Sequence, residues 1–370
     1  MRNAPVVLHV LTALDFGGVE RRMEMLAEAT ADGSRYEHRF CALGGGGAAS
    51  AFISGAGCRV DCLAMPVKIP STRLIVKLVQ LMRATRPVIV HTHGAEANFH
   101  GLIAASLARV PVRVAEEIGI PTHSRLAKFV FRTVYSRANY VIGMSDGVVR
   151  KLIDSNEVPF TKAITLFNPI KCPPSRTGLP SPDRDRIQIG FLGRLESVKN
   201  PLGLLRAFGR LASENDAVDL LFVGHGSLYD EMNHVVREQG LEQRVTISGY
   251  QRHPFETLAN CDLFVQSSIT EGFSVALVEA LGFGLPAIAT NTGGTDEVII
   301  PGETGWVIKP NDEDALYAAM RDGCSRSRFE LHDMGMRARK SVLNRFDPRD
   351  YVRKLEELYA RADRQGWIKR

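Results

Sequence analysis

The sequence has no run of apolar residues that approaches the length of a membrane-spanning helix. Its six cysteines are scattered, and no pair has the spacing of a zinc or redox motif. The apolar segment Val6–Leu11 fits a buried first strand better than a signal peptide, because it is short and contains His9. We therefore expect a cytoplasmic globular protein with reduced thiols, and neither a membrane-spanning protein nor a disulfide scaffold.

The net charge of +5 is small, but it is unevenly distributed along the 370 residues. Residues 1–172 carry 21 basic and 13 acidic side chains, whereas the remainder carries 25 and 28. A basic first half suggests an anionic partner such as an acceptor phosphate or a membrane surface. The basic residues form no tail and no nucleic-acid motif, so we expect no nucleic-acid partner.

Strand-like and helix-like segments alternate along the whole chain, which is typical of parallel, doubly wound α/β sheets. The predicted helices include Val19–Thr30, Leu74–Arg83, Leu126–Ser136 and the C-terminal Asp350–Asp363. The predicted strands are Val6–Leu11, Tyr36–Leu43, Val88–His91, Val112–Glu116, Tyr140–Gly143, Ile187–Leu192, Asp219–Val223, Val245–Ser248, Leu263–Gln266 and Ala287–Thr290.

A proline-rich segment, residues 172–182, interrupts the alternation and predicts a linker. A chain of this length also favours two domains. We therefore predict two Rossmann-like lobes facing a central cleft: an acceptor-side lobe, residues 1–172, and a nucleotide-sugar-binding lobe, residues 183–345. Residues 346–370 are predicted to form a helical segment that packs back toward the first lobe. Ligands of such sheets bind at the C-terminal ends of the strands.

The most informative motif holds two carboxylates, Glu271 and Glu279, eight residues apart around a strand-to-helix junction. The helix is predicted to begin just after Ser274, so free backbone N–H groups lie between the two acids. Such a helix start binds phosphate well, and flanking carboxylates bind hydroxyls, which is the layout a sugar nucleotide needs. The alternative is an ordinary exposed junction with two solvated glutamates.

Two cations follow the first strand of the second lobe. Arg194 comes directly after Gly193, and Lys199 precedes a helix that starts near Pro201. The guanidinium fork and the ammonium group together could neutralise a diphosphate. Two solvated surface cations are the alternative.

Several loops at predicted strand ends would let a ligand approach the backbone closely. Gly17-Gly18 follows the first strand, although it is no complete dinucleotide motif and a plain turn is the alternative. Gly224 follows a later strand, and Ser248-Gly249-Tyr250 could border a nucleotide base. His91 and His93 could begin a metal site, but no third ligand is evident, so we assign no metal. One of the two is expected to make a polar contact in the cleft.

In this order, the motifs resemble retaining nucleotide-sugar glycosyltransferases of the GT-B fold, and they are most similar to glycosyltransferase family 4. The resemblance covers nearly the whole chain and is carried by Gly17-Gly18, His93, Gly193-Arg194, Lys199 and the pair Glu271 and Glu279. One departure is Ser274, where family members often carry glycine or proline.

The resemblance implies a role for each matching residue. Glu271 would hold hydroxyls of the transferred sugar, Glu279 the ribose, and His93 the sugar from the first lobe. Arg194 and Lys199 would hold the diphosphate. The donor-binding set that we predict is Gly17, Gly18, Gly193, Gly224, Gly272, Phe273, Ser274, Val275, Ala276 and Glu279.

The residue types suit sugar transfer without a metal or other cofactor, because cations and a helix N-terminus stabilise the charge that grows on the departing diphosphate. No nucleophile stands out, and the resemblance implies same-face substitution in which the leaving phosphate takes the acceptor proton. Glu271 is then a positioning residue.

The acceptor is less well defined by the sequence. We expect a UDP-sugar donor, with GDP as the second choice, and a glycan or lipid-linked acceptor in envelope polysaccharide or exopolysaccharide biosynthesis. Arg125, Lys128 and Arg132 on one predicted helix could contact an anionic membrane, although this helix could simply cover the sheet. A GT-B enzyme with a soluble acceptor, as in sucrose or trehalose synthesis, and a non-catalytic sugar-nucleotide binder stay open.

Overall fold

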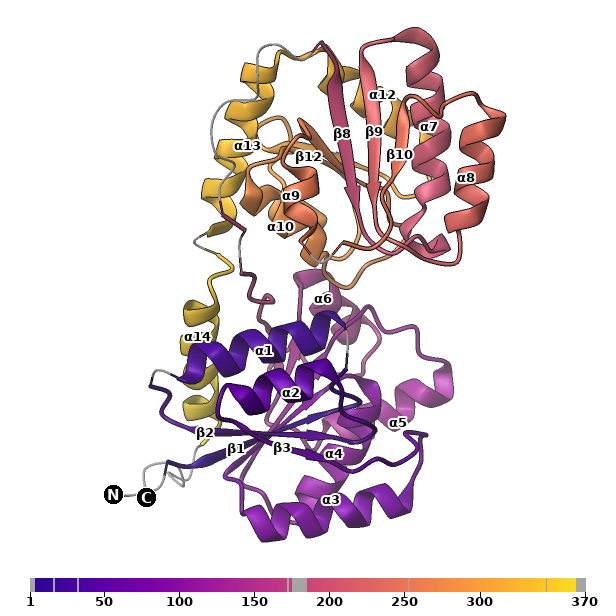
Figure 1. The fold of residues 1–370 in the computed structure, drawn as a ribbon. Helices are drawn as coiled ribbons and strands as arrows, with labels where there is room; N and C mark the ends of the chain where they lie inside the picture. Colours follow the sequence, from indigo (N-terminus) through magenta and orange to yellow (C-terminus); the bar gives the residue numbers. More distant parts are fainter. Residues whose placement is uncertain are drawn as a thin grey trace. The chain divides into compact units, whose positions relative to one another are not determined.

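The structure is a computed structural model that describes residues 4–363, apart from residues 16, 32, 172, 175–184, 252 and 344. It divides into two compact units: in Figure 1 the first is coloured indigo to magenta, with its C-terminal helix in yellow, and the second runs from magenta through orange to gold. Unit 1 is Met1–Ile170 together with Phe346–Arg370, and unit 2 is Lys171–Arg345. The C-terminal segment therefore belongs to the same unit as the first strand.

Unit 1 is built on a parallel sheet with the strand order β3-β2-β1-β4-β5-β6-β7. The order reverses between β1 and β4, as expected of a doubly wound sheet. The strands are β1 Val6–Leu11, β2 Glu37–Ala42, β3 Arg59–Cys62, β4 Ile89–His93, β5 Val112–Glu117, β6 Tyr140–Gly143 and β7 Ala163–Thr165.

Helices cover both faces of this sheet. Helices α1, α2 and α14 share one hydrophobic core with the sheet, whereas α3, α4, α5 and α6 contribute to the cores on the other face. Their bounds are α1 Gly18–Ala31, α2 Ala48–Gly55, α3 Thr72–Thr85, α4 Ala95–Leu107, α5 Arg125–Tyr135, α6 Asp146–Asp154 and α14 Pro348–Ala362.

Unit 2 repeats the design with the strand order β10-β9-β8-β11-β12-β13, again all parallel. The strands are β8 Ile187–Leu192, β9 Val218–Val223, β10 Val245–Ile247, β11 Leu263–Gln266, β12 Ala287–Thr290 and β13 Gly305–Ile308. The helices are η1 Ser197–Lys199, α7 Pro201–Glu214, α8 Tyr229–Glu238, α9 Pro254–Leu258, α10 Val275–Phe283, α11 Thr295–Val298, α12 Glu313–Ser325 and α13 Arg328–Leu343.

The two parallel sheets confirm the predicted α/β architecture. Five of the predicted strands have the observed bounds, and the others differ by one or two residues at one or both ends. The sequence analysis missed three strands, β3, β7 and β13, and each lies at an edge of its sheet. Most of the predicted linker, residues 172–182, lies outside the described residues, and Pro173 and Pro174 are in neither helix nor strand.

The C-terminal helix α14 packs on unit 1, where Tyr351, Leu355 and Tyr359 are buried in the core shared with α1. The Tyr359 hydroxyl also forms a hydrogen bond with Nδ1 of His91 on β4, at 2.8 Å. Among the residues described, no helix combines the length and the apolar character that crossing a bilayer requires.

Candidate functional site

The predicted diphosphate cations lie where the strand order of unit 2 reverses. Strand β8 pairs with β9 on one side and with β11 on the other. Gly193-Arg194 follows β8, Lys199 ends η1 just beyond it, and Glu271 is in the loop after β11. Open α/β sheets bind ligands at such a reversal, so these residues of unit 2 lie where a ligand is expected to bind.

Hydrogen bonds fix the two loops on which Lys199 and Glu271 lie. Lys199 Nζ donates to Glu271 Oε1, and Ser268 Oγ donates to the same oxygen at 2.9 Å. The backbones are joined as well, because Ile269 N donates to Val198 O at 2.8 Å. The Lys199 and Glu271 side chains are 21% and 12% exposed, so both reach solvent only partly. Arg194, which follows β8, is exposed.

Helix α10 begins where the sequence predicts, and Ser274 caps it. Its Oγ accepts a hydrogen bond from Leu277 N at 3.3 Å and also donates to Gln266 Oε1. The serine thus takes the capping role at this position, which explains how the chain accommodates the departure from the family pattern. Val275 and Ala276 form the first turn, whose N–H groups have no carbonyl partner within a helix. Glu279 is buried, one turn further on.

Two glycines allow the surrounding loops to pack against each other. Gly224 has a φ of +151°, and a Cβ there would lie 1.9 Å from the carbonyl oxygen of Gly193. Gly293 has a φ of +53° and packs against the backbone of Glu271: a Cβ there would lie 2.3 Å from the Glu271 carbonyl oxygen. Side chains at either position would push apart the loops that carry the candidate site.

The remaining donor-site candidates of unit 2 are arranged around this edge. Ser248 N donates to Phe222 O, and Gly224 N donates to Gly249 O, both at 2.9 Å, which joins the loops after β9 and β10. Tyr250 is 77% exposed, whereas Phe273 is buried beside the half-buried Gly272. These positions are consistent with a base-bordering loop, and their predicted roles stay predictions.

In unit 1, Gly17 and Gly18 lie at the start of α1, as predicted. Neither has a positive φ, so what glycine provides here is the absence of a side chain. A Cβ on Gly18 would meet nothing within 4 Å, whereas one on Gly17 would meet the carboxylate of Glu20.

His93, the predicted sugar contact of unit 1, is only 1% exposed. Its Nδ1 lies 2.6 Å from Glu116 Oε2, and its Nε2 lies 3.1 Å from His9 Nδ1. Both ring nitrogens therefore have partners inside unit 1. Burial lowers the pKa of His93 despite the hydrogen bond to Glu116, so that the ring is neutral at pH 7.

The sequence analysis missed a buried ion pair next to His93. Arg22 of α1 donates to Glu116 Oε1 of β5 and, at 2.9 Å, to Asn168 Oδ1. Burial raises the pKa of the Glu116 carboxyl, but the Arg22 charge and the hydrogen bonds outweigh it, so the pKa is lowered overall. One signal was available: Arg22 lies between Val19 and Leu26 on the apolar stripe of α1, where a charge needs a partner.

Two family models match this chain. Residues 17–169 match the family described as glycosyl transferase 4-like domain, and residues 180–341 match glycosyl transferases group 1. Among solved structures, Anabaena Alr3699/HepE in complex with UDP has a TM-score of 0.82 at 20% identity, with 96% of this chain and all of that chain covered. Two Rossmann-like parallel-sheet units are the architecture of GT-B glycosyltransferases. The chain is a family 4-like glycosyltransferase of the GT-B fold, as the motifs implied.

Two curated relatives show the range of similar proteins. The N-acetylgalactosamine-N,N'-diacetylbacillosaminyl-diphospho-undecaprenol 4-alpha-N-acetylgalactosaminyltransferase of Campylobacter jejuni is 26% identical over 54% of this chain. The match spans about half of that relative's length (54%). The UDP-Gal:alpha-D-GlcNAc-diphosphoundecaprenol alpha-1,3-galactosyltransferase of Escherichia coli is 26% identical over 79% of this chain and 80% of its own length.

Proposed function

We propose that this protein is a retaining glycosyltransferase that moves a sugar from a nucleoside-diphosphate sugar to a glycan or lipid-linked acceptor in polysaccharide assembly. One observation carries the proposal: Lys199 is paired with Glu271 at the strand reversal of unit 2, where Arg194 follows β8 and α10 begins after the loop that carries Glu271. Cations and free amides suit a diphosphate, and buried carboxylates suit sugar hydroxyls. UDP is the favoured nucleotide of the donor because the Anabaena structure holds UDP and the E. coli relative is named for UDP-Gal.

The same residues would stabilise the reaction as it proceeds. As the glycosidic bond to the diphosphate breaks, negative charge grows on the leaving oxygens, next to Lys199, Arg194 and the α10 amides. The leaving phosphate can then take the acceptor proton, so the transfer itself needs neither a metal nor a protein base. Glu271, held by Lys199 and Ser268, would orient the sugar.

A thermal-shift series tests the donor site directly. We expect one nucleoside diphosphate, UDP first, to raise the melting temperature by about 5 °C or more when it is present at about 100 times its Kd. In Glu279→Ala the shift should largely disappear, because the ribose contact is lost. Glu242→Ala is the matched control, since Glu242 is exposed before β10 at the opposite edge of the sheet.

The outcome separates the candidate functions. A nucleotide-dependent shift that Glu279→Ala abolishes and Glu242→Ala retains supports the donor site. If no nucleotide stabilises the protein even at millimolar concentration, the transferase proposal fails and a sugar-binding role takes its place.

The lipid-linked acceptors named for the two relatives support a peripheral membrane contact, which we place on α5. Phe131 and Val134 of this helix are buried, whereas Leu126 and Phe129 are 74% and 71% exposed. The two exposed apolar side chains alternate with the basic residues Arg125, Lys128 and Arg132. Exposed apolar side chains among basic ones suit the surface of an anionic bilayer.

Reversing the three α5 charges to glutamate should weaken binding to phosphatidylglycerol vesicles by more than about 100-fold, since the loss of three basic residues at about 1 kcal/mol each already gives this factor and the new carboxylates are repelled by the surface. Vesicle co-sedimentation measures this, with phosphatidylcholine vesicles as the control. A second variant, Leu126→Ser with Phe129→Ser, should also lose binding while it retains every charge. Equal sedimentation of wild type and both variants would rule out α5 as the contact.

A further inference from the structure

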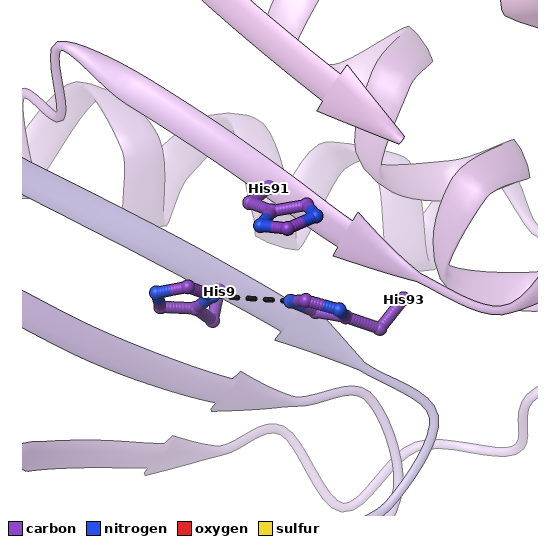
Figure 2. Close-up of side chains that lie close together, drawn as sticks. All are labelled: His9, His91 and His93. Carbon is purple, nitrogen blue, oxygen red and sulfur yellow. Dashed lines mark hydrogen bonds between the residues drawn. The ribbon is translucent and has the colours of Figure 1, made fainter. Parts of the chain in front are cut away.

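Three histidines from two neighbouring strands converge in the core of unit 1 (Figure 2). His9 lies on β1 directly opposite His91 on β4, and His93 follows two residues later on the same face. One ring nitrogen of each lies within 4.8 Å of the others, and all three side chains are at most 1% exposed.

The outer nitrogen of each ring is fixed by a partner. His93 Nδ1 lies 2.6 Å from Glu116 Oε2, and His91 Nδ1 lies 2.8 Å from the Tyr359 hydroxyl. His9 Nε2 lies 2.9 Å from His38 Nδ1. Ligand histidines of metal sites are oriented in this way, by a carboxylate, hydroxyl or other polar group on the nitrogen that faces away from the ion.

The inner nitrogens have fewer partners. His9 Nδ1 and His93 Nε2 are hydrogen-bonded only to each other, at 3.1 Å, and His91 Nε2 is buried without a hydrogen-bond partner. The nearest carboxylate oxygen recorded for it, Glu116 Oε2, is 3.7 Å away. A buried imidazole nitrogen left without a partner costs free energy, which an ion at the centre of the three rings would remove.

The number of protons in the hydrogen-bond network also points to the contact between His9 and His93. A continuous chain of hydrogen bonds runs from Glu116 through His93, His9, His38 and Ser34 to Glu356. These five links join two carboxylates that only accept, whereas three neutral imidazoles and one hydroxyl supply four protons. If the outer links are all made, His9 Nδ1 and His93 Nε2 both present lone pairs. A cation between these two nitrogens would remove the contact between lone pairs.

We propose that His9, His91 and His93 bind a transition-metal ion of the Zn²⁺ type in the core of unit 1. A proton shared by His9 and His93 would satisfy the count but would leave His91 Nε2 without a partner, whereas a metal ion uses all three. Nitrogens that bind a tetrahedral ion at about 2.0–2.1 Å lie about 3.3 Å apart, so the His9–His93 pair already has a suitable spacing. His91 needs a shift on the order of 1 Å.

Such an ion would have a structural role. It would join β1 to β4 at the strand reversal of unit 1 and, through the Tyr359 hydrogen bond, hold α14 on the sheet. A tetrahedral ion takes four ligands and the three imidazoles fill three positions, so the fourth would be left for water or hydroxide. The ion would also use His93 Nε2, so the same nitrogen could not contact a sugar. The site shares no residue with the donor site proposed for unit 2.

The test uses the full chain without a histidine tag, unfolded with a chelator and refolded with Zn²⁺ or Co²⁺, because the buried site is closed to solvent once folded. We expect one equivalent of metal per chain by elemental analysis and the intense visible absorption of tetrahedral Co²⁺. The melting temperature should rise by about 5 °C or more relative to chelator-refolded protein. His91→Gln should lose the metal, whereas His234→Ala, which removes an exposed histidine of α8, should retain it.

Other results would overturn the proposal. Binding of less than about a tenth of an equivalent, or equal metal contents in wild type and His91→Gln, rules out the site. If His91→Gln does not fold, His9→Gln provides the second test with the same expectation. A metal-free wild type whose ¹⁵N spectrum shows one doubly protonated imidazole would show that a proton takes the place of the ion.

Discussion

Replacing Lys199 with methionine should lower kcat by about 10²- to 10³-fold, the loss expected when one group that stabilises transition-state charge is removed. Lys199 is held in place in unit 2, because its ammonium group is paired with Glu271 and the neighbouring Val198 O accepts a hydrogen bond from Ile269 N. Methionine keeps most of the side-chain volume and removes only the charge. KM for the donor should change less than kcat, since the charge on the diphosphate grows as the bond breaks.

The assay follows nucleoside-diphosphate release from the donor that gives the largest thermal shift. Lys309→Met is the matched control, because Lys309 is an exposed lysine just past the end of β13 in the same unit. Lys199→Arg should recover part of the rate, as it restores the charge with a different shape. A Lys199→Met enzyme with wild-type kcat would show that the diphosphate binds elsewhere.

The central strands could be predicted because they are buried and mostly apolar, as in Leu263–Gln266 and Ala287–Thr290. The missed edge strands lack this signal. Strand β3 contains Arg59 and Asp61, and its burial pattern is partly exposed throughout. Strand β7 has only three residues, all half-buried. Their pairing depends on neighbours that the local sequence does not reveal.

The same distinction holds for the sites. The residues of unit 2 could be assembled from sequence because one rule, that ligands bind beyond the C-terminal ends of parallel strands, brings Arg194 and Glu271 together. No such rule brings His9 next to His91. Their contact depends on β1 and β4 being neighbours and on the register that sets them opposite each other. Likewise, Arg22 and Glu116 lie on a helix and a strand 94 residues apart.

The Arg22–Glu116 pair should have the largest effect on stability. Arg22→Leu removes the cation and leaves Glu116 charged in the core, which should lower the free energy of unfolding by about 3–5 kcal/mol. The double variant Arg22→Leu with Glu116→Gln should be more stable than the single variant, because no uncompensated charge is left. Urea unfolding measures both, and only the transition that belongs to unit 1 should shift, since two units need not unfold together.

The pH dependence identifies the charge as the cause. In the wild type the pKa of Glu116 lies below its ordinary 4.5, so this group stabilises the fold above pH 4.5 and the effect is lost as pH falls through the lowered value. Without Arg22, burial alone should raise the pKa of Glu116 above 4.5, and the sign reverses: stability should fall as pH rises through that raised pKa. The deficit of Arg22→Leu should therefore be smaller at pH 5 than at pH 8. A deficit that is the same at both pH values would indicate lost packing of the arginine side chain instead of an unpaired carboxylate.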